Sequence, residues 1–339
     1  MVINKIERIP APPKDEFYRE YILTQRPVII TNLFEHTPLS QMDTLDKVRT
    51  RLADLPVRVC HNYIAHLVSG KTVDDPRMMN LGAYLDFLKA QPLNADIYVD
   101  YSTPQNLLEL LPLTQYQDFW DENDLYSHMF AAGGSNYAHL HYDVDQRNVL
   151  LFQVFGKKRF VLIHPRETHK LDPIDQPNLC CSSGFFLENM SEVQKTNFLE
   201  YTNAFEVVLH PGETIFMPMM FWHYIEYLEP AMSVVYRLGR NPYNRRFAEI
   251  FPAPSVDVQS LSLLLINEES VKPEHIAWLN QLENVSRSFK GSESDRQAIL
   301  NYLCLKMRGQ YVGFEPIQTM QELTRRQNIL EQASLYSRI

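Results

Sequence analysis

A run of strand-like segments with alternating side chains occupies the middle of this 339-residue chain and limits its fold more than any other feature. From about residue 126 to 245 the hydrophobic pattern has a period of two and is rich in β-branched and aromatic residues, which is typical of strands with one buried face. Turn signals such as Phe155-Gly156 and Pro211-Gly212 separate the segments. We therefore expect eight strands: Met129–Ala132, His139–Asp143, Asn148–Val154, Lys158–Ile163, Ala204–Leu209, Thr214–Met217, Trp222–Tyr227 and Met232–Leu238.

Eight short strands in one region favour a mainly β fold, the double-stranded β-helix or jelly roll that cupins use. The long connection Pro165–Asn203 would then be the crossover that joins two four-stranded halves. The pattern predicts three parts: an N-terminal mixed helix and strand elaboration of the core over residues 1–125, the jelly-roll core over 126–250, and a helical region over 251–339.

Helical periodicity marks both flanks of the predicted core. On the N-terminal side, Thr44 is expected to cap a helix whose Leu45, Val48 and Leu52 share one face. The other N-terminal elements expected are a helix that carries Leu81, Tyr84 and Leu88, and the strands Val28–Thr31, Val57–His61 and Ile97–Tyr101.

Three apolar stripes mark the C-terminal region. They are Leu279, Leu282 and Val285 with Gly291 as a stop, then Ile299, Leu303 and Met307 in a helix opened by Ser292 and Asp295, and finally Met320, Leu323 and Leu330. Such stripes pack on the barrel or build a homodimer, and stripe geometry alone does not separate the two uses.

Composition excludes several classes of partner. The 32 Lys+Arg against 41 Asp+Glu give a net charge of −9, which disfavours bulk binding to nucleic acid or to an anionic membrane. The longest apolar runs are too short to span a bilayer, and the start of the chain lacks the pattern of a signal peptide. The four cysteines show no CxxC spacing, and the adjacent pair Cys180-Cys181 suits neither a relaxed disulfide nor a zinc knuckle. We therefore expect a protein of the reducing cytoplasm.

Two motifs far apart in the sequence supply candidate metal ligands. Residues two apart on a strand point to the same face, so His141 and Asp143 are expected to project together. His223, 82 positions after His141, lies on a strand of the second half and is placed to be a third ligand. Two histidines and one carboxylate on one face of an octahedron are the ligands of non-haem Fe(II) oxygenases. His139 shares the strand parity of His141 and is its strongest competitor.

These motifs resemble those of the jumonji-C branch of Fe(II)- and 2-oxoglutarate-dependent oxygenases. The resemblance is closest to the small hydroxylases, of the factor-inhibiting-HIF asparaginyl hydroxylase and tRNA wybutosine hydroxylase type, and covers most of residues 15–245. The first-half motif is His141-Tyr142-Asp143, Asn148, Gln153–Ile163 and Pro165, and the second-half motif is Pro211–Thr214, Pro218 and Trp222–Glu226.

The resemblance implies roles for individual residues. It makes His141, Asp143 and His223 the iron ligands and catalytic centre, and it implies that Lys158 pairs with the distal carboxylate of 2-oxoglutarate. Lys157 is the alternative if the hairpin register differs by one residue.

Further contacts to the cosubstrate are implied at Asn148 and Tyr98. Two positions depart from the pattern of some relatives, because Ala138 replaces a threonine and Arg237 replaces an asparagine. Arg237 is then a second cosubstrate contact or part of a substrate pocket. It also begins a basic group with Arg240, Arg245 and Arg246, which is either a salt-bridged linker or a patch for an acidic peptide or phosphate.

The function expected from the resemblance is a dioxygenase that uses Fe(II), 2-oxoglutarate and O2 and hydroxylates a protein or peptide side chain, with release of succinate and CO2. A small molecule or modified tRNA as substrate, and demethylation as the outcome, stay open. The alternatives are a metal cupin enzyme that does not use 2-oxoglutarate, in which His139 is a ligand, and an interaction module without chemistry.

Overall fold

Two β-sheets carry the fold of the computed structural model, which describes residues 4–62, 76–111, 116, 126–174, 181–251, 258, 260–265 and 268–311. Within these residues, one sheet has five strands in the order β1 (Asn4–Lys5), β11 (Phe205–Leu209), β10 (Lys158–Ile163), β13 (Trp222–Tyr227) and β8 (Tyr137–His141). The other has nine, in the order β2 (Glu7–Ile9), β3 (Val28–Ile30), β12 (Thr214–Met217), β9 (Asn148–Phe155), β14 (Ala231–Leu238), β7 (Tyr126–Ala132), β6 (Ile97–Ser102), β4 (Pro56–His61) and β5 (Arg77–Asn80).

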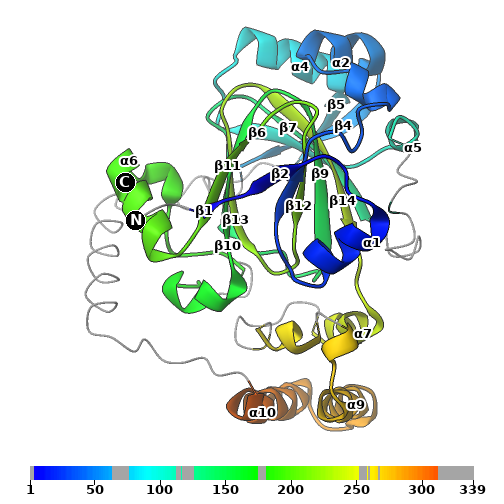
Figure 1. Ribbon diagram of the computed structural model, residues 1–339, viewed down its shortest axis with the longest axis vertical. Coiled ribbons are helices and arrows are strands. Elements are labelled where there is room, and N and C mark those ends of the chain that lie inside the picture. The colour runs from blue at the N-terminus through cyan, green and yellow to red at the C-terminus, as the bar shows by residue number, and fades with distance from the viewer. Residues whose placement is uncertain are drawn as a thin grey trace.

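The eight strands expected from the period-two pattern are all present as β7 to β14, so the predicted jelly-roll core is confirmed (Figure 1). Each sheet takes two strands from each half of the core: β8, β10, β11 and β13 in the five-stranded sheet, and β7, β9, β12 and β14 in the other. Apolar side chains of both sheets form a shared interior, in which Val149 and Val235 meet Phe160 and Leu162. This interleaving brings residues from distant parts of the sequence into one barrel.

The N-terminal part extends the nine-stranded sheet at both of its ends, since β3 pairs with β12 and β6 pairs with β7. The predicted helices are observed as α2 (Leu45–Leu52), where Thr44 Oγ1 accepts a hydrogen bond from the Lys47 amide, and α4 (Leu81–Ala90). Buried side chains of both helices join one core cluster with strand residues such as Val57 and Val99. The remaining N-terminal helical segments are α1 (Lys14–Phe17), a π-helical turn (Tyr18–Ile22), a 3₁₀ turn (Pro38–Gln41) and α5 (Gln105–Leu108).

The predicted crossover connects β10 to β11, which are antiparallel neighbours in the five-stranded sheet. It contains two 3₁₀ turns (Pro165–Lys170 and Leu187–Asn189) and α6 (Glu192–Tyr201), whose N-terminus has a capping box formed by Ser191 and Gln194. Cys180 lies outside the described residues, whereas Cys181 is described and half-buried.

Helices of the C-terminal region lie below the barrel in Figure 1 and have a core of their own. They are α7 (Pro242–Ile250), 3₁₀ turns (Ser260–Leu265 and Glu268–Ser270), α9 (Pro273–Ser288) and α10 (Glu293–Tyr311). The stripe on α9 is buried as predicted at Leu279 and Leu282.

The stripe predicted on α10 is buried at Met307 and partly buried at Leu303, but it is wrong at Ile299. Leu300, Cys304 and Met307 are buried, whereas Ile299 is 36% exposed. Apolar residues occupy two adjacent stripes of this helix, and packing against α9 selects between them. The stripe Met320, Leu323 and Leu330 lies outside the described residues, and the homodimer and the three-part division of the chain stay predictions. No helix among the described residues combines the length and apolarity needed to cross a membrane.

Candidate metal centre

His141 and His223 face each other across neighbouring strands. The register of β8 and β13 pairs the two residues directly, and their ring centroids lie 4.2 Å apart. The side chain of Asp143 completes the group, with Oδ1 3.8 Å from Nε2 of His141 and Oδ2 4.0 Å from Nε2 of His223. One potential ligand atom from each residue lies within 4.8 Å of the others, which is the spacing of a three-ligand metal site.

The strand that carries His141 is displaced from the predicted range His139–Asp143 by two residues toward the N-terminus. It ends at His141, and Asp143 lies on the following loop. The predicted alternation nevertheless continues past the end of the strand, since His141 and Asp143 both line one cavity whereas Tyr142 between them packs against Trp222 in a separate cluster. Asp143 itself has no partner in the pairing of β8 with β13. The position of Asp143 therefore depends on what holds the loop.

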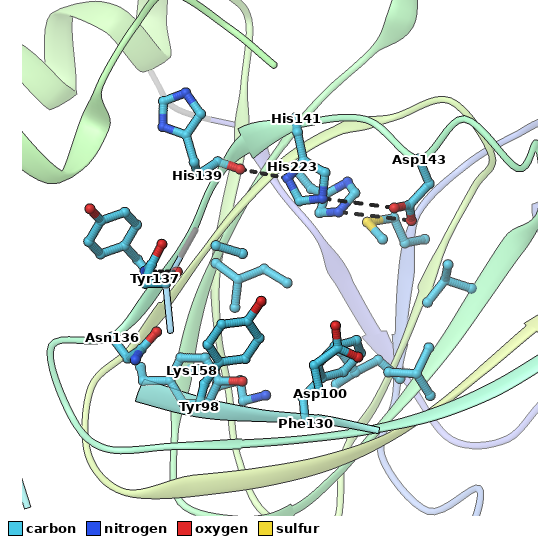
Figure 2. Close-up of a pocket in the computed structure, with 18 of the residues that line it drawn as sticks. Tyr98, Asp100, Phe130, Asn136, Tyr137, His139, His141, Asp143, Lys158 and His223 are labelled. Atoms are coloured by element: carbon cyan, nitrogen blue, oxygen red, sulfur yellow. Dashed lines mark hydrogen bonds and ion pairs between the residues drawn. The ribbon is translucent and has the colours of Figure 1, made fainter. Parts of the chain in front are cut away.

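Hydrogen bonds to backbone carbonyls orient both imidazole rings, and Figure 2 shows the one between His141 and His139. Nδ1 of His141 lies 2.6 Å from the carbonyl oxygen of His139, and Nδ1 of His223 lies 3.0 Å from that of Phe221. A carbonyl oxygen only accepts, so each Nδ1 carries the proton and each Nε2 presents a lone pair. Partners of this kind set the tautomer and the direction of metal-binding histidines.

The protonation states also suit a metal. Burial, and then the nearby His223, lower the pKa of His141 to about 3, so its imidazole is neutral at physiological pH. Burial by itself raises the pKa of Asp143, but the Arg237 guanidinium and the two histidines outweigh it and hold that pKa well below its usual range. Two imidazoles and one carboxylate form the donor set that Fe(II) takes in non-haem oxygenases, so the residues present fit this metal.

His139 is directed away from this group. Its Nε2 lies 2.8 Å from the Ser183 carbonyl and its Nδ1 lies 3.2 Å from Glu188, and Figure 2 shows its ring pointing away from His141 and His223. The expectation of a shared face is wrong because of a β-bulge. Between its two paired positions, His141 and Ala138, β8 has one residue more than β13 has opposite it, which breaks the alternation.

A cavity of about 350 Å³ extends from the triad between the two sheets. Figure 2 shows the triad at one end and Lys158 with Tyr98 at the other. Apolar side chains such as Leu151, Met217 and Ile225 line the space between the ends. The arrangement offers room for a small molecule that reaches from the triad to a cationic group.

Lys158 is a buried lysine at the far end of this cavity, with 1% of its surface exposed. Its Nζ lies 4.1 Å from the centroid of the Tyr227 ring, and none of the ion pairs found in the part of the chain that the structure describes involves Lys158. Burial holds the pKa of Lys158 well below that of an exposed lysine. Lys157, the alternative of the register argument, is exposed. Lys158 is therefore the lysine that faces the interior.

Sequence comparison places this geometry in a family. A model of the cupin-like domain matches residues 13–237, which is most of the chain. The chain belongs to the cupin-like domain family. It is 24% identical over 268 residues to JmjC domain-containing protein D of Dictyostelium discoideum, covering 69% of this chain and 57% of that protein.

Other relatives are named as a lysine-specific demethylase and as an HSPB1-associated protein. The chain is 26% identical over 243 residues to lysine-specific demethylase 8 of Danio rerio, covering 68% of this chain and 57% of the relative. It is 37% identical to HSPB1-associated protein 1 of Rattus norvegicus over 84 residues, 24% of this chain and 17% of that protein. The chain spans about half the length of the longer-matching relatives. The JmjC resemblance is thereby confirmed, and JmjC enzymes use Fe(II), 2-oxoglutarate and O2.

The remaining predicted contacts of this cupin-like domain fall in two places. Tyr98 lines the cavity near Lys158. Arg237 also lines it and donates a hydrogen bond to Asp143 of the triad. Asn148 is buried, but its Oδ1 accepts a hydrogen bond from the Met219 amide and the residue is absent from the cavity lining. Ala138, at the position where some relatives have a threonine, lines the cavity. The cosubstrate roles of these residues stay predictions.

Two further residues line the cavity without having been singled out in the sequence. Tyr227 shares strand parity with His223 on β13, and Asp100 shares it with Tyr98 on β6, so strand alternation could have identified both. Asp100 is held by His128, whose Nδ1 lies 2.8 Å from its Oδ1. The acidic side chain thus belongs to the wall of the cavity opposite β8.

Proposed function

We propose that this protein is an Fe(II)- and 2-oxoglutarate-dependent dioxygenase that hydroxylates a protein or peptide side chain. The observation that carries the proposal is the buried Lys158 in the same cavity as the His141, Asp143 and His223 triad. An unpaired buried charge is costly, and an anion bound in the cavity would supply its missing partner.

The chain's own residues would divide the work in the following way. The triad would hold the metal from one side and leave the opposite positions open. Lys158 would bind the distal carboxylate of 2-oxoglutarate, and the apolar wall of Leu151, Met217 and Ile225 would exclude water. When bound, Fe(II) with 2-oxoglutarate supplies the oxidation, in which O2 is consumed, 2-oxoglutarate is converted to succinate and CO2, and one oxygen atom enters the substrate.

A protein side chain as substrate is supported by the relatives named lysine-specific demethylases. The excess of acidic residues, with a net charge of −9, also disfavours an extended nucleic-acid surface. We propose hydroxylation as the outcome because it needs only the oxidation described above. The alternative without 2-oxoglutarate requires His139 as a ligand, whereas both nitrogens of that ring are hydrogen-bonded elsewhere.

The test is succinate formation from 2-oxoglutarate by purified protein with Fe(II) and ascorbate, before any substrate is known. We expect slow turnover by the wild type and none by Asp143→Ala. Asp86→Ala is the matched control, because Asp86 of α4 forms an exposed ion pair with Arg49 of α2 and does not line the cavity. Full turnover by Asp143→Ala, or failure of the metal-loaded wild type to bind 2-oxoglutarate, would overturn the proposal.

A further inference from the structure

The ligand Asp143 lies on a loop, so the β-ladder does not fix its position. The loop joins β8 to β9 and runs through residues 142–147, whereas His141 and His223 are held in paired strands. It also carries a second acidic residue, Asp145, and two like charges on one short loop repel each other. A metal site that needs Asp143 in one place must therefore restrain this loop.

Arg237 of β14 bonds both acidic side chains. One terminal nitrogen donates to Oδ1 of Asp143 at 2.9 Å, and the other donates to Oδ2 of Asp145 at 3.1 Å. Arg147 adds a longer bond to the same Asp145 oxygen at 3.3 Å. All three partners are largely buried, with side-chain exposures of 19% for Arg237, 14% for Asp143 and 23% for Asp145. The planar guanidinium can bridge two carboxylates in a way that a single ammonium cannot.

The next element along the chain holds the other side of the loop. Gln146 is fully buried and has a φ of 55°, a left-handed conformation that non-glycine residues rarely adopt. Its Oε1 accepts a long hydrogen bond of 3.4 Å from Asn244 on α7, and Asn244 is itself fully buried. Helix α7 begins four residues after the end of β14, and Asn241 caps it through the Tyr243 and Asn244 amides.

We propose that the segment β14–α7 is a clamp on the metal-ligand loop, with Arg237 as the positioning residue for Asp143 and Asn244 as its second point of contact. Arg237 occupies Oδ1 of Asp143 and leaves Oδ2 as the oxygen without a hydrogen-bond donor among the described residues. The carboxylate would therefore meet a metal through one oxygen. The inference rests on the metal site of the proposed function, and it assigns Arg237 to the ligand rather than to the cosubstrate.

Metal binding tests the clamp without any turnover assay. The probe is Mn(II), titrated by calorimetry into the wild type, Arg237→Lys and Arg237→Gln. We expect both variants to bind Mn(II) about 10- to 100-fold more weakly, the usual effect of removing a group that orients a metal ligand. Arg246→Gln is the matched control, because Arg246 lies on the same segment but forms its hydrogen bonds with Glu283 and Asn280 of α9, and none of those found among the described residues reaches the loop. Its Mn(II) affinity should equal that of the wild type.

A second readout separates positioning from general destabilisation. In the Co(II)-loaded protein, the visible absorption bands should shift in Arg237→Lys, because the carboxylate gains freedom to change its mode of coordination, and should not shift in Arg246→Gln. If either Arg237 variant does not fold, Asn244→Ala should weaken Mn(II) binding through the other contact. Unchanged affinity and spectra in the folded Arg237 variants would overturn the clamp, whereas failure of the wild type to bind Mn(II) would overturn the proposed metal site itself.

Discussion

Replacing the buried Lys158 by methionine is expected to stabilise the ligand-free protein and to abolish its response to 2-oxoglutarate. Lys158 is 1% exposed, and its Nζ lies over the face of the Tyr227 ring. Burying its ammonium group lowers the stability of the ligand-free protein, because the lost hydration is compensated only when an anion binds beside it. Methionine has a similar length and no charge, so the exchange removes the desolvation cost while keeping the volume.

The magnitude follows from opposing effects. Desolvation of a buried ion costs several kcal/mol after relaxation, and the contact with Tyr227 offsets up to about 2 kcal/mol of it. We expect Lys158→Met to raise the free energy of unfolding by about 1–4 kcal/mol, the range seen when buried charges are replaced by apolar residues of similar volume. At about 2 °C per kcal/mol in a chain of this size, the Tm should rise by about 2–8 °C.

The assay is thermal unfolding with Mn(II) present, with and without 2-oxoglutarate. At a ligand concentration of 100 times Kd, 2-oxoglutarate should stabilise the wild type by about 2.7 kcal/mol, and Lys158→Met should show no such gain. Lys157→Met is the matched control, because its side chain is exposed and its stability should change by less than about 0.5 kcal/mol. A fall in the Tm of Lys158→Met, or a retained response to 2-oxoglutarate, would refute the reasoning.

Three further predictions test the electrostatics and the scaffold of the site. Because burial lowers the pKa of Lys158 and a bound anion raises it again, the affinity for 2-oxoglutarate measured by calorimetry should fall as pH rises. Over the same pH range the stability of the ligand-free protein should rise, since the unfolded chain keeps a proton on Lys158 that the folded protein has lost. His139→Ala should keep stoichiometric Mn(II), measured by metal analysis, and loss of the metal would instead identify His139 as a ligand. The same variant should lose about 3 kcal/mol of stability in urea unfolding, because Glu188 is left buried and unpaired. Gly156→Ala should lower the free energy of unfolding by more than about 2 kcal/mol in the same urea assay, since φ is +69° and a Cβ atom would lie 2.1 Å from the Pro230 carbonyl oxygen. A Gly156→Ala variant as stable as the wild type would contradict the hairpin geometry that places Lys158.

The core strands could be predicted from the sequence because their signal is local. The predicted bounds Lys158–Ile163, Thr214–Met217 and Trp222–Tyr227 equal the observed strand bounds, since runs of β-branched and aromatic residues between turn signals mark strands even where both faces are buried. The caps at Thr44 and at Ser292 were likewise readable from residue type and spacing. These features depend on neighbours within a few residues.

The buried face of α10 and the side-chain directions on β8 were not readable in this way. Helix α10 offers two adjacent apolar stripes, and packing against α9 buries Leu300 rather than Ile299. On β8, one additional residue in the pairing with β13 turns His139 away from His141. A bulge is a property of two paired strands, so the sequence of one strand does not reveal it.

In the candidate metal centre, the residue types could likewise be predicted from the sequence, but their positions depend on the tertiary structure. The residue types of the triad, and the motifs that carry them, were present in the sequence, but His141 and His223 are 82 positions apart and meet only because β8 and β13 pair in one register. The role proposed for Arg237 depends wholly on tertiary structure, because nothing local connects it to Asp143 94 positions earlier. Side-chain periodicity determines which residues can face the interior, whereas strand pairing and loop packing decide which of them come within bonding distance.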